Sequence, residues 1–516
     1  MSIFCFRVSW HITKCFSRDR TLSTAPDSLA ADAPLRATHQ RKERGKLLQI
    51  LGVGFGIAVA VGNTISAGIV RTPGDIAARL PNHWLFFSVW FGGAFYALMS
   101  AFQLAELSSA IPKSGGQYNF SRRAIGDYAG FIVGWSDWLS TCGTTGAVGI
   151  VIGEYMAHMF PPFDGSFQLT GTFGALLTRL SPDLASIPKL KFTAVSAIIL
   201  FAVLQWKSIS MGSKVQNFTT LLKGLVFFIM VVACFTFGGH LRQASEAAAP
   251  LAQAAAPLAV PVGAALVTAL LLGIQATIYT YDGWDGVIYF GDEIKNPGHL
   301  VPRAIFASLF SIVLIYLLVN AAVLYVLPMN EIAGNNFSLG LAAERVFGHH
   351  GDFIFRSIMV LALFSSLNAL HLMGARVIYA MSRDGLFFRA VSRVNKGGTP
   401  TLGLLLSAVV GVAFAIFSFE RVIAMLAFFF VTNYMLSFVS MLLLRARQPE
   451  LARPYRAWGY PWTTAIALLG SIAFLLEAIR EDRANSVLTL IALACSYPVF
   501  RVLKLASKGQ TARDAV

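Results

Sequence analysis

Charged side chains are scarce in this sequence of 516 residues, at 13 %, where soluble domains carry about a quarter. Acidic residues are the scarcest of them, with 26 Asp and Glu against 41 Lys and Arg. Apolar residues make up 56 % of the chain, and phenylalanine alone occurs 41 times. This composition excludes a soluble globular protein and predicts a chain that lies in a lipid bilayer.

Cysteine is also rare, with five residues in the whole chain. Cys142, Cys234 and Cys495 fall within apolar runs, where cysteine is a small packing residue. Cys5 and Cys15 are candidates for acylation near a membrane, although reduced, unmodified thiols are the simpler interpretation. No two cysteines have a spacing that indicates a disulfide.

The sequence lacks the motifs of common enzyme chemistry. It contains no phosphate-binding loop, no set of His and Cys with zinc spacing, and no Ser–His–Asp order. We therefore expect neither an enzyme nor a bound metal or other cofactor.

Long apolar runs are the dominant feature. Twelve segments are long and apolar enough to cross a bilayer as helices, which predicts an all-α polytopic membrane protein with about 12 transmembrane helices. The segments lie near residues 47–71, 84–111, 128–160, 190–206, 215–238, 262–290, 303–327, 353–382, 401–418, 421–444, 461–479 and 485–503. Between the second and third, the polar segment 112–128 is expected to form an amphipathic or re-entrant element at the membrane face.

The distribution of Lys and Arg predicts the orientation of these spans. If the connections alternate between the two sides, 28 of the 41 basic residues fall on the side that holds both termini and 11 on the other. Both termini are therefore expected to be cytoplasmic. Residues 1–46 lack a sustained apolar core, so we interpret them as a disordered basic tail rather than a cleaved signal, with a second tail at 504–516. Because the positive charge is explained by topology, no nucleic-acid partner is expected.

Two of the spans are interrupted. In the sixth, Asp282, Gly283, Asp285 and Gly286 follow an apolar run after about half a membrane thickness at roughly 1.5 Å per residue. Carboxylates at that depth are costly unless they face a cavity or a partner, and unwound backbone is tolerated there only where it lines protein or water. We interpret this segment as a discontinuous helix at a solute site.

The first span carries a similar interruption of small residues, GNTISAGIVRTP, over 62–73. Paired interruptions five spans apart indicate two inverted repeats whose half-helices meet at a central site. The predicted repeats are 47–240 and 262–444, joined by an external Ala/Pro-rich linker at 247–261, with two additional helices in 461–503.

At the first interruption, Ile65, Ser66, Ala67 and Gly68 are expected to leave backbone N–H groups bare at the positive end of a half-helix, which suits a carboxylate. The alternative is a groove of small residues for helix packing.

At the second interruption, freed carbonyls are expected to accept hydrogen bonds from an ammonium group, and aromatic rings to cover it. Its candidate residues are Tyr279, Tyr281, Asp282, Gly283 and Trp284. Asp282 can pair with a cationic side chain, with the amine of a substrate or with a proton, or it can simply cap a helix end. Asp285 is expected to face helix packing or the cytoplasmic vestibule.

Lys223 lies within the apolar fifth span. It can extend to the membrane surface, or it can be a buried ammonium that takes the place of a bound sodium ion between the repeats. Three further acids lie in or beside spans: Glu106 is expected to face the cytoplasmic vestibule, and Asp137 and Glu154 have no partner that the sequence identifies.

Two motifs carry a resemblance to a known family. Glu106 with Pro112, Gly115, Gly116 and Tyr118 matches an E…P..GG.Y pattern, and the segment YDGWDGVIYFGDEIKNP follows the sixth span. Together with ISAGIV in the first span, these motifs resemble amino acid permeases of the amino acid–polyamine–organocation (APC) superfamily, especially the L-type amino acid transporter branch. The resemblance covers residues 47–445 well and the last two spans loosely.

This resemblance implies a LeuT-type fold of five plus five inverted spans and a sodium-independent secondary transporter of amino acids, driven by exchange or protons. It implies a plasma-membrane protein (inner membrane in a bacterium) that binds the amino acid's carboxylate at the first break and its amino group at the sixth. By the same resemblance, Tyr279 gates the site, Trp284 is the motif's nearby tryptophan, and Lys223 occupies the region of a sodium site. Asp282 falls where some carriers of cationic amino acids have Asp.

The sequence also departs from that family. Ser66 replaces the usual first glycine of the first-span motif, which would tighten access to the backbone. The loop 161–189 contains no cysteine, so no covalent heavy-chain partner is expected. Two alternatives remain open: a carrier of polyamines or other organic cations, and an amino acid sensor that does not transport.

Overall fold

The computed structural model describes residues 47–168, 186–248, 259–348, 350–417, 419–481 and 483–513. The predictions for the N-terminal tail with Cys5 and Cys15, for most of the Ala/Pro-rich linker and for the middle of the loop 161–189 lie outside these residues, as does the very end of the C-terminal tail.

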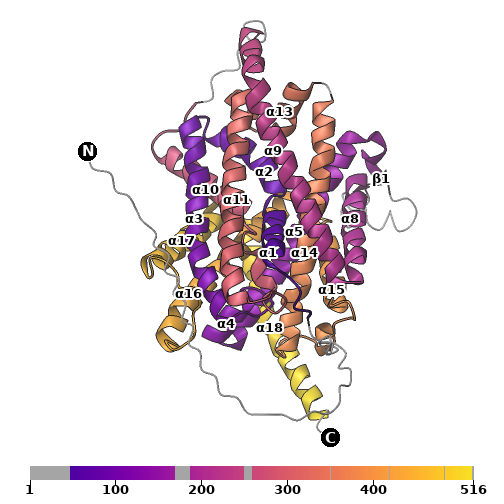
Figure 1. The fold of residues 1–516 in the computed structure, drawn as a ribbon, viewed down its shortest axis with the longest axis vertical. Coiled ribbons are helices and arrows are strands. Elements are labelled where there is room, and N and C mark those ends of the chain that lie inside the picture. The colour runs from indigo at the N-terminus through magenta and orange to yellow at the C-terminus, as the bar shows by residue number, and fades with distance from the viewer. Residues whose placement is uncertain are drawn as a thin grey trace, which may run out of the picture. The chain divides into compact units, whose positions relative to one another are not determined.

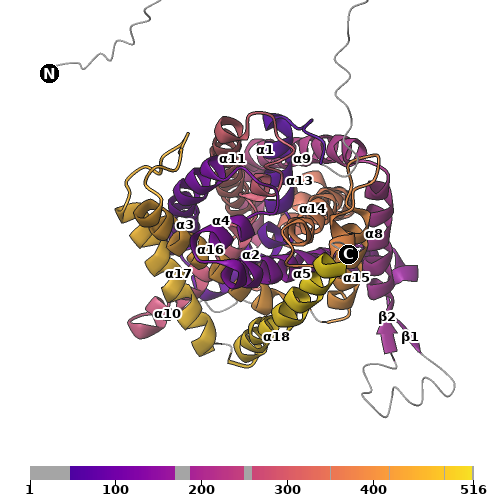
Figure 2. The same ribbon diagram turned by 90° about the horizontal axis from the view of Figure 1, so that it is seen from below.

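The described chain is almost entirely helical (Figure 1). Its elements are α1 (Val53–Thr64), α2 (Ala67–Arg79), α3 (His83–Ala110), α4 (Tyr118–Ala124), α5 (Asp127–Met159), η1 (Pro161–Phe163), β1 (Ser166–Gln168), β2 (Ser186–Pro188), α8 (Lys189–Trp206), α9 (Ile209–Ala248), α10 (Ala264–Tyr281), η3 (Gly286–Tyr289), α11 (Pro297–Val326), α12 (Met329–Ile332), α13 (Ser338–Phe347), α14 (Gly351–Arg383), η4 (Arg389–Ser392), α15 (Thr401–Phe414), α16 (Phe419–Arg447), α17 (Trp462–Glu481) and α18 (Arg483–Arg513). The short antiparallel hairpin of β1 and β2 was not predicted. Seen along the helices, α17 and α18 lie on the outside of the bundle, where α18 packs on α5 and α16 (Figure 2).

The predicted class, an all-α polytopic membrane protein, is confirmed. Among the residues described, nine helices are long and apolar enough to cross a membrane, and the bent pair α1 and α2 makes a tenth span. At the predicted third and ninth spans lie α5, of 33 residues, and α15, a shorter apolar helix of 14 residues. The count of twelve stays a prediction, as do the two repeats.

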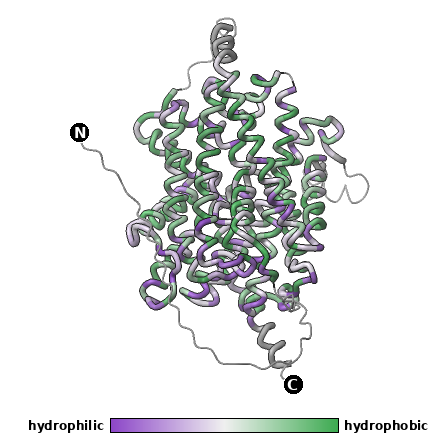
Figure 3. The backbone as a smooth tube through the Cα atoms, viewed as in Figure 1, coloured by the Kyte–Doolittle hydropathy of each residue, from purple (hydrophilic) through white to green (hydrophobic). Residues whose placement is uncertain are grey.

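Apolar residues predominate along the helices of the bundle (Figure 3), and many of their large apolar side chains are exposed, as a hydrocarbon environment requires. In α9, Phe218 and Leu221 are 67 % and 73 % exposed, whereas Gln216 and Lys223 on the same helix are buried. This arrangement is the reverse of a water-exposed helix, because lipid solvates the apolar face and the polar groups must find partners inside the protein.

The predicted break in the first span lies between α1 and α2, whose axes differ by 43°. Small residues there allow a close approach, since a Cβ on Gly68 would lie 3.1 Å from the side chain of Thr280 in α10. The break in the sixth span begins after Tyr281, where Gly283 adopts φ +106° and a Cβ would meet Asn63 at 2.5 Å. The two breaks therefore face each other.

The predicted interruption of the sixth span lies where expected, since α10 ends at Tyr281, the chain unwinds at Gly283 and it continues as the short η3. The segment 112–128 contains α4, whose Tyr118 and Phe120 are buried, and Gly115 N donates to Tyr289 O at 3.2 Å. The position of this segment at the membrane face stays a prediction.

Candidate functional site

A cavity of about 50 Å³ lies between the two helix breaks. It is closed by α1 and α2 on one side, by α10 and η3 on another, and by α5, α14 and α16 around them. Six of the predicted site residues line it: Ser66, Ala67, Gly68, Tyr279, Asp282 and Gly283. The hydroxyl of Ser66 is buried and has no hydrogen-bond partner among the described residues, so it is available to a ligand.

The other three predicted residues of the breaks do not line the cavity. Ile65 is fully buried in the packed core behind the first break. Tyr281 packs against Trp90 and Tyr316, at ring distances of 6.0 and 5.2 Å, and so faces α3 and α11. Trp284 stacks on Tyr434 at 5.9 Å. They support the cavity wall from behind.

Three carboxylates line the cavity: Asp282 and Asp285 from the unwound segment after α10, and Asp137 from α5. Asp282 Oδ1 accepts a hydrogen bond from Tyr434 OH at 2.7 Å, and its side chain caps no helix end. Asp285, expected to face helix packing or the vestibule, instead lines the cavity, because the unwound backbone around Gly283 brings both acids to one side. Gln117 Nε2 donates to Asp285 Oδ2 at 3.1 Å.

Asp137 of α5 is the third acid of the cavity. The sequence identified no partner for it, but Tyr289 OH donates to its Oδ1 at 2.7 Å. Asn433 and Tyr434 of α16 also line the cavity and were not predicted. Gln117 and Tyr289 had a sequence signal, since they lie within the GGQY and YDGWDGVIYFGDEIKNP motifs.

Lys223 is a buried residue of α9, with 1 % of its surface exposed. Its Nζ donates to Gly62 O at 2.9 Å, Ile65 O at 2.5 Å and Ser366 Oγ at 3.2 Å. This geometry excludes the interpretation that the lysine extends to the membrane surface. The ammonium binds the carbonyls that the first break leaves without helical partners.

Comparison with known proteins identifies the family. The model of the amino acid permease family matches residues 55–493, which is most of the chain. This chain belongs to the amino acid permease family. The permease is therefore a multi-pass membrane transporter of amino acids.

Several characterised permeases are similar over nearly their whole length. The serine/threonine exchanger SteT of Bacillus subtilis is 25 % identical over 469 residues, which cover 90 % of this chain and 98 % of that protein. The branched-chain amino acid permease BcaP of Lactococcus lactis is 25 % identical over 442 residues, with 82 % and 88 % covered. The b(0,+)-type amino acid transporter 1 of Mus musculus is 21 % identical over 474 residues, with 91 % and 90 % covered.

Contacts around the cavity connect the helices that line it. On one side, Arg71 of α2 forms an ion pair with Glu154 of α5, which gives Glu154 a partner that the sequence did not identify. The ring of Tyr279 lies 6.4 Å from that of Phe430. On the other side, Gln117 bridges Asp285 and Ser437 Oγ, at 3.1 and 3.0 Å.

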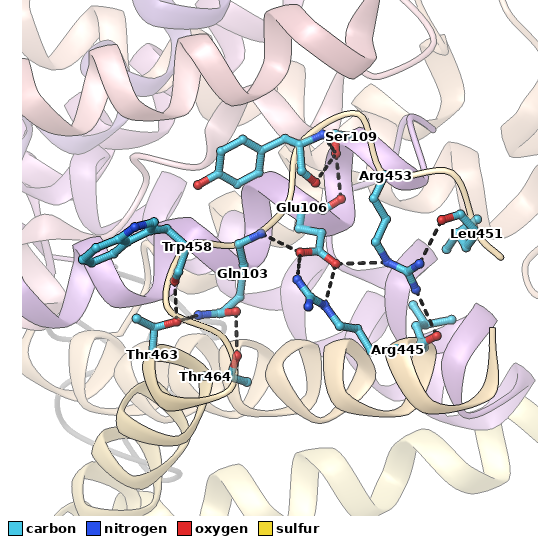
Figure 4. Close-up of polar contacts among 12 residues, drawn as sticks. Gln103, Glu106, Ser109, Arg445, Leu451, Arg453, Trp458, Thr463 and Thr464 are labelled. Atoms are coloured by element: carbon cyan, nitrogen blue, oxygen red, sulfur yellow. Dashed lines mark hydrogen bonds and ion pairs between the residues drawn. The ribbon is translucent and has the colours of Figure 1, made fainter. Parts of the chain in front are cut away.

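Glu106 was predicted to face the cytoplasmic vestibule, but it is buried, with 1 % of its surface exposed. Figure 4 shows two arginines converging on its carboxylate. Arg445 Nε donates to Glu106 Oε1 at 2.9 Å, and Arg453 Nε forms an ion pair with the same oxygen at 3.1 Å. Ala457 N donates to Oε2 at 2.6 Å. Glu106 thus joins the end of α3 to the end of α16 and to the loop before α17.

Proposed function

We propose that this permease carries amino acids across the plasma membrane by alternating access, without sodium, and that exchange or a proton gradient drives it. The observation that carries the proposal is that two broken helices face one cavity of about 50 Å³. Discontinuous helices meeting at a central site are typical of secondary transporters. Both termini are cytoplasmic in this proposal, and the repeats 47–240 and 262–444 rock around the site.

The two breaks suit the two ends of a zwitterionic amino acid. At the start of α2, backbone N–H groups near Ser66, Ala67 and Gly68 attract the carboxylate, since a helix N-terminus carries partial positive charge. At the end of α10, free carbonyls accept from the α-ammonium group and Tyr279 covers it, while the Asp282 carboxylate is available to a positively charged side chain. This assignment is supported by the position of all these residues on the cavity wall.

Sodium independence rests on Lys223. Its ammonium contacts three oxygen atoms, Gly62 O, Ile65 O and Ser366 Oγ, and so takes the position that a sodium ion coordinated by such oxygens would occupy. We expect purified permease in liposomes to take up amino acid at the same rate in sodium medium as in choline medium. The comparison of the two media is made once with and once without amino acid inside the vesicles. A strict requirement for sodium would show that Lys223 does not replace the ion.

Asp282 is expected to select for positive charge. Asp282→Asn should reduce uptake of arginine or lysine at least tenfold more than uptake of leucine, because a lost partner for a buried charge costs more than 1.4 kcal/mol, or about a factor of ten. Competition by each unlabelled amino acid measures the difference, with Asp164→Asn in an exposed loop as the control. Equal losses for all three amino acids would reject Asp282 as the counter-charge.

A second candidate function, a carrier of polyamines or other organic cations, is favoured by the three acids in the cavity. Such a carrier would accept putrescine and ignore compounds with a free carboxylate. The same competition assay decides, because putrescine displaces the labelled substrate only in that case. Measurable uptake would also exclude a sensor that does not transport.

A further inference from the structure

The cavity holds three carboxylates and no basic side chain in its described lining. Asp137 lies on α5, and Asp282 and Asp285 lie on the unwound segment after α10. Among the described residues none of the three forms an ion pair. Because ionised carboxylates within a membrane protein are costly without compensating charge, this site needs positive charge from elsewhere.

The hydrogen bonds to these acids are too few to stabilise three negative charges. Asp137 accepts from Tyr289, Asp282 from Tyr434 and Asp285 from Gln117. The backbone of Gly283 also faces Asp282, and Tyr434 also faces Asp285, so one tyrosine proton serves two of the acids. An ionised carboxylate offers about four acceptor positions, and a tyrosine hydroxyl has a single proton to donate.

Asp137 is the least satisfied of the three. It is 3 % exposed, and its Oδ2 has no hydrogen-bond partner in the described part of the chain. A buried polar atom on a cavity wall that has no partner in the protein is a position for a ligand or a proton.

A zwitterionic amino acid does not supply the missing charge. Its ammonium and its carboxylate cancel, and in the proposed function its carboxylate is held at the first break. Lys223 does not supply the charge either, because its ammonium binds Gly62 O and Ile65 O and does not line the cavity.

We infer that the cavity of this permease takes up one positive charge more than a zwitterionic amino acid carries, and that Asp137 holds it. The charge is a proton on Asp137 when the substrate is neutral, and the second ammonium group, shared by Asp137 and Asp282, when the substrate is a dibasic amino acid. This inference rests on the proposed function and specifies the total charge that the same site binds together with the substrate.

Of the three acids in the cavity, only Asp137 has an oxygen that is both fully buried and without a hydrogen-bond partner in the described part of the chain. The titratable groups that share the cavity with it are Tyr279, Asp282, Asp285, Tyr289 and Tyr434. The part of α14 that faces the cavity contributes the apolar Leu370 and Met373.

Lysine and its neutral analogue norleucine test the inference, since they differ only in the second ammonium group. Calorimetric titration of the full-length permease at neutral pH, in two buffers of different ionisation enthalpy, gives the number of protons taken up or released on binding. We expect the norleucine complex to contain about one more proton than the lysine complex. In Asp137→Asn this difference disappears.

The controls separate Asp137 from the rest of the site. Asp127→Asn makes the same charge change on α5 outside the cavity and should keep the one-proton difference. Tyr289→Phe removes the hydrogen bond to Asp137 but keeps the carboxylate, so it should also keep the difference, which guards against a general defect in folding.

Equal proton numbers for the two ligands would overturn the inference, and so would a difference that persists in Asp137→Asn. If lysine does not bind at all, the pH dependence of norleucine binding decides. A bound proton requires the norleucine affinity to fall with rising pH, by up to about tenfold per unit, so an affinity that is constant from pH 6 to 9 would also overturn the inference. Uptake of amino acids into liposomes with any of these results would leave the proposed function standing, whereas absence of uptake would reject that function itself.

Discussion

Replacing Lys223 with methionine is expected to abolish most transport by the permease. The substitution keeps the length of the side chain but removes the ammonium that bridges Gly62 O and Ile65 O at the first break. A buried carbonyl that loses its donor costs about 1 to 3 kcal/mol. Gly62 O keeps the hydrogen bond from Ser366 Oγ at 2.8 Å, so the loss falls on Ile65 O. About 2 kcal/mol would lower the population of the binding-competent conformation, and with it the apparent affinity, roughly 30-fold.

The measurement is equilibrium binding and uptake in liposomes, with Lys214→Met as the control. Lys214 lies on the same helix, α9, but is exposed, so its replacement should change neither quantity. If Lys223→Met binds and transports substrate as well as the native permease does, the ammonium does not maintain the break.

The helix breaks were predictable because their cause is local. Small residues over 65–68 and Gly283 occur at a depth where an uninterrupted apolar helix would be expected, and only Gly tolerates φ +106° without strain. The resemblance of the surrounding motifs then indicated that the two breaks face each other, which composition alone does not establish. The end of α10 at Tyr281 agrees with the predicted interruption at Asp282 and Gly283.

The acids of the cavity were harder to predict. Asp137 lies on α5, which is buried on most of its faces, so apolar and small residues surround it and no polar stripe marks the side that faces the cavity. Its partner Tyr289 is 152 residues away in sequence. Asp285 was misplaced because helical periodicity was assumed where the backbone is unwound at Gly283.

The aromatic residues were misplaced for a related reason. Tyr281 and Trp284 flank the break, and aromatic rings beside a cation site are common. Yet Tyr281 is the last residue of α10, and the direction of its side chain is set by the helix, which points it at Trp90 of α3. Sequence spacing does not give the rotation of one helix against its neighbours, which depends on packing.

The second large effect, on stability, is expected at Glu106, whose carboxylate forms ion pairs with both Arg445 and Arg453. Glu106→Gln would leave two guanidinium groups without their counter-charge, and breaking a buried ion pair in this way costs about 3 to 5 kcal/mol. The lower end of that range applies, because the side chain of Arg445 is 23 % exposed and water can solvate it in part. Thermal unfolding of the purified permease, followed by tryptophan fluorescence, should show a clearly lower midpoint.

Glu450→Gln provides the matched control, since Glu450 is an exposed acid in the same loop and its change should stay within about 0.5 kcal/mol. The carboxylate of Glu106 also fixes the end of α16, the helix whose Tyr434 contacts Asp282 in the cavity. Glu106→Gln should therefore reduce uptake even at temperatures where the variant remains folded, because a loosened α16 no longer holds Tyr434 in place. Unchanged stability would mean that the two arginines find other partners. Full uptake in a destabilised variant would mean that the ion pairs of Glu106 stabilise the fold without influencing the site.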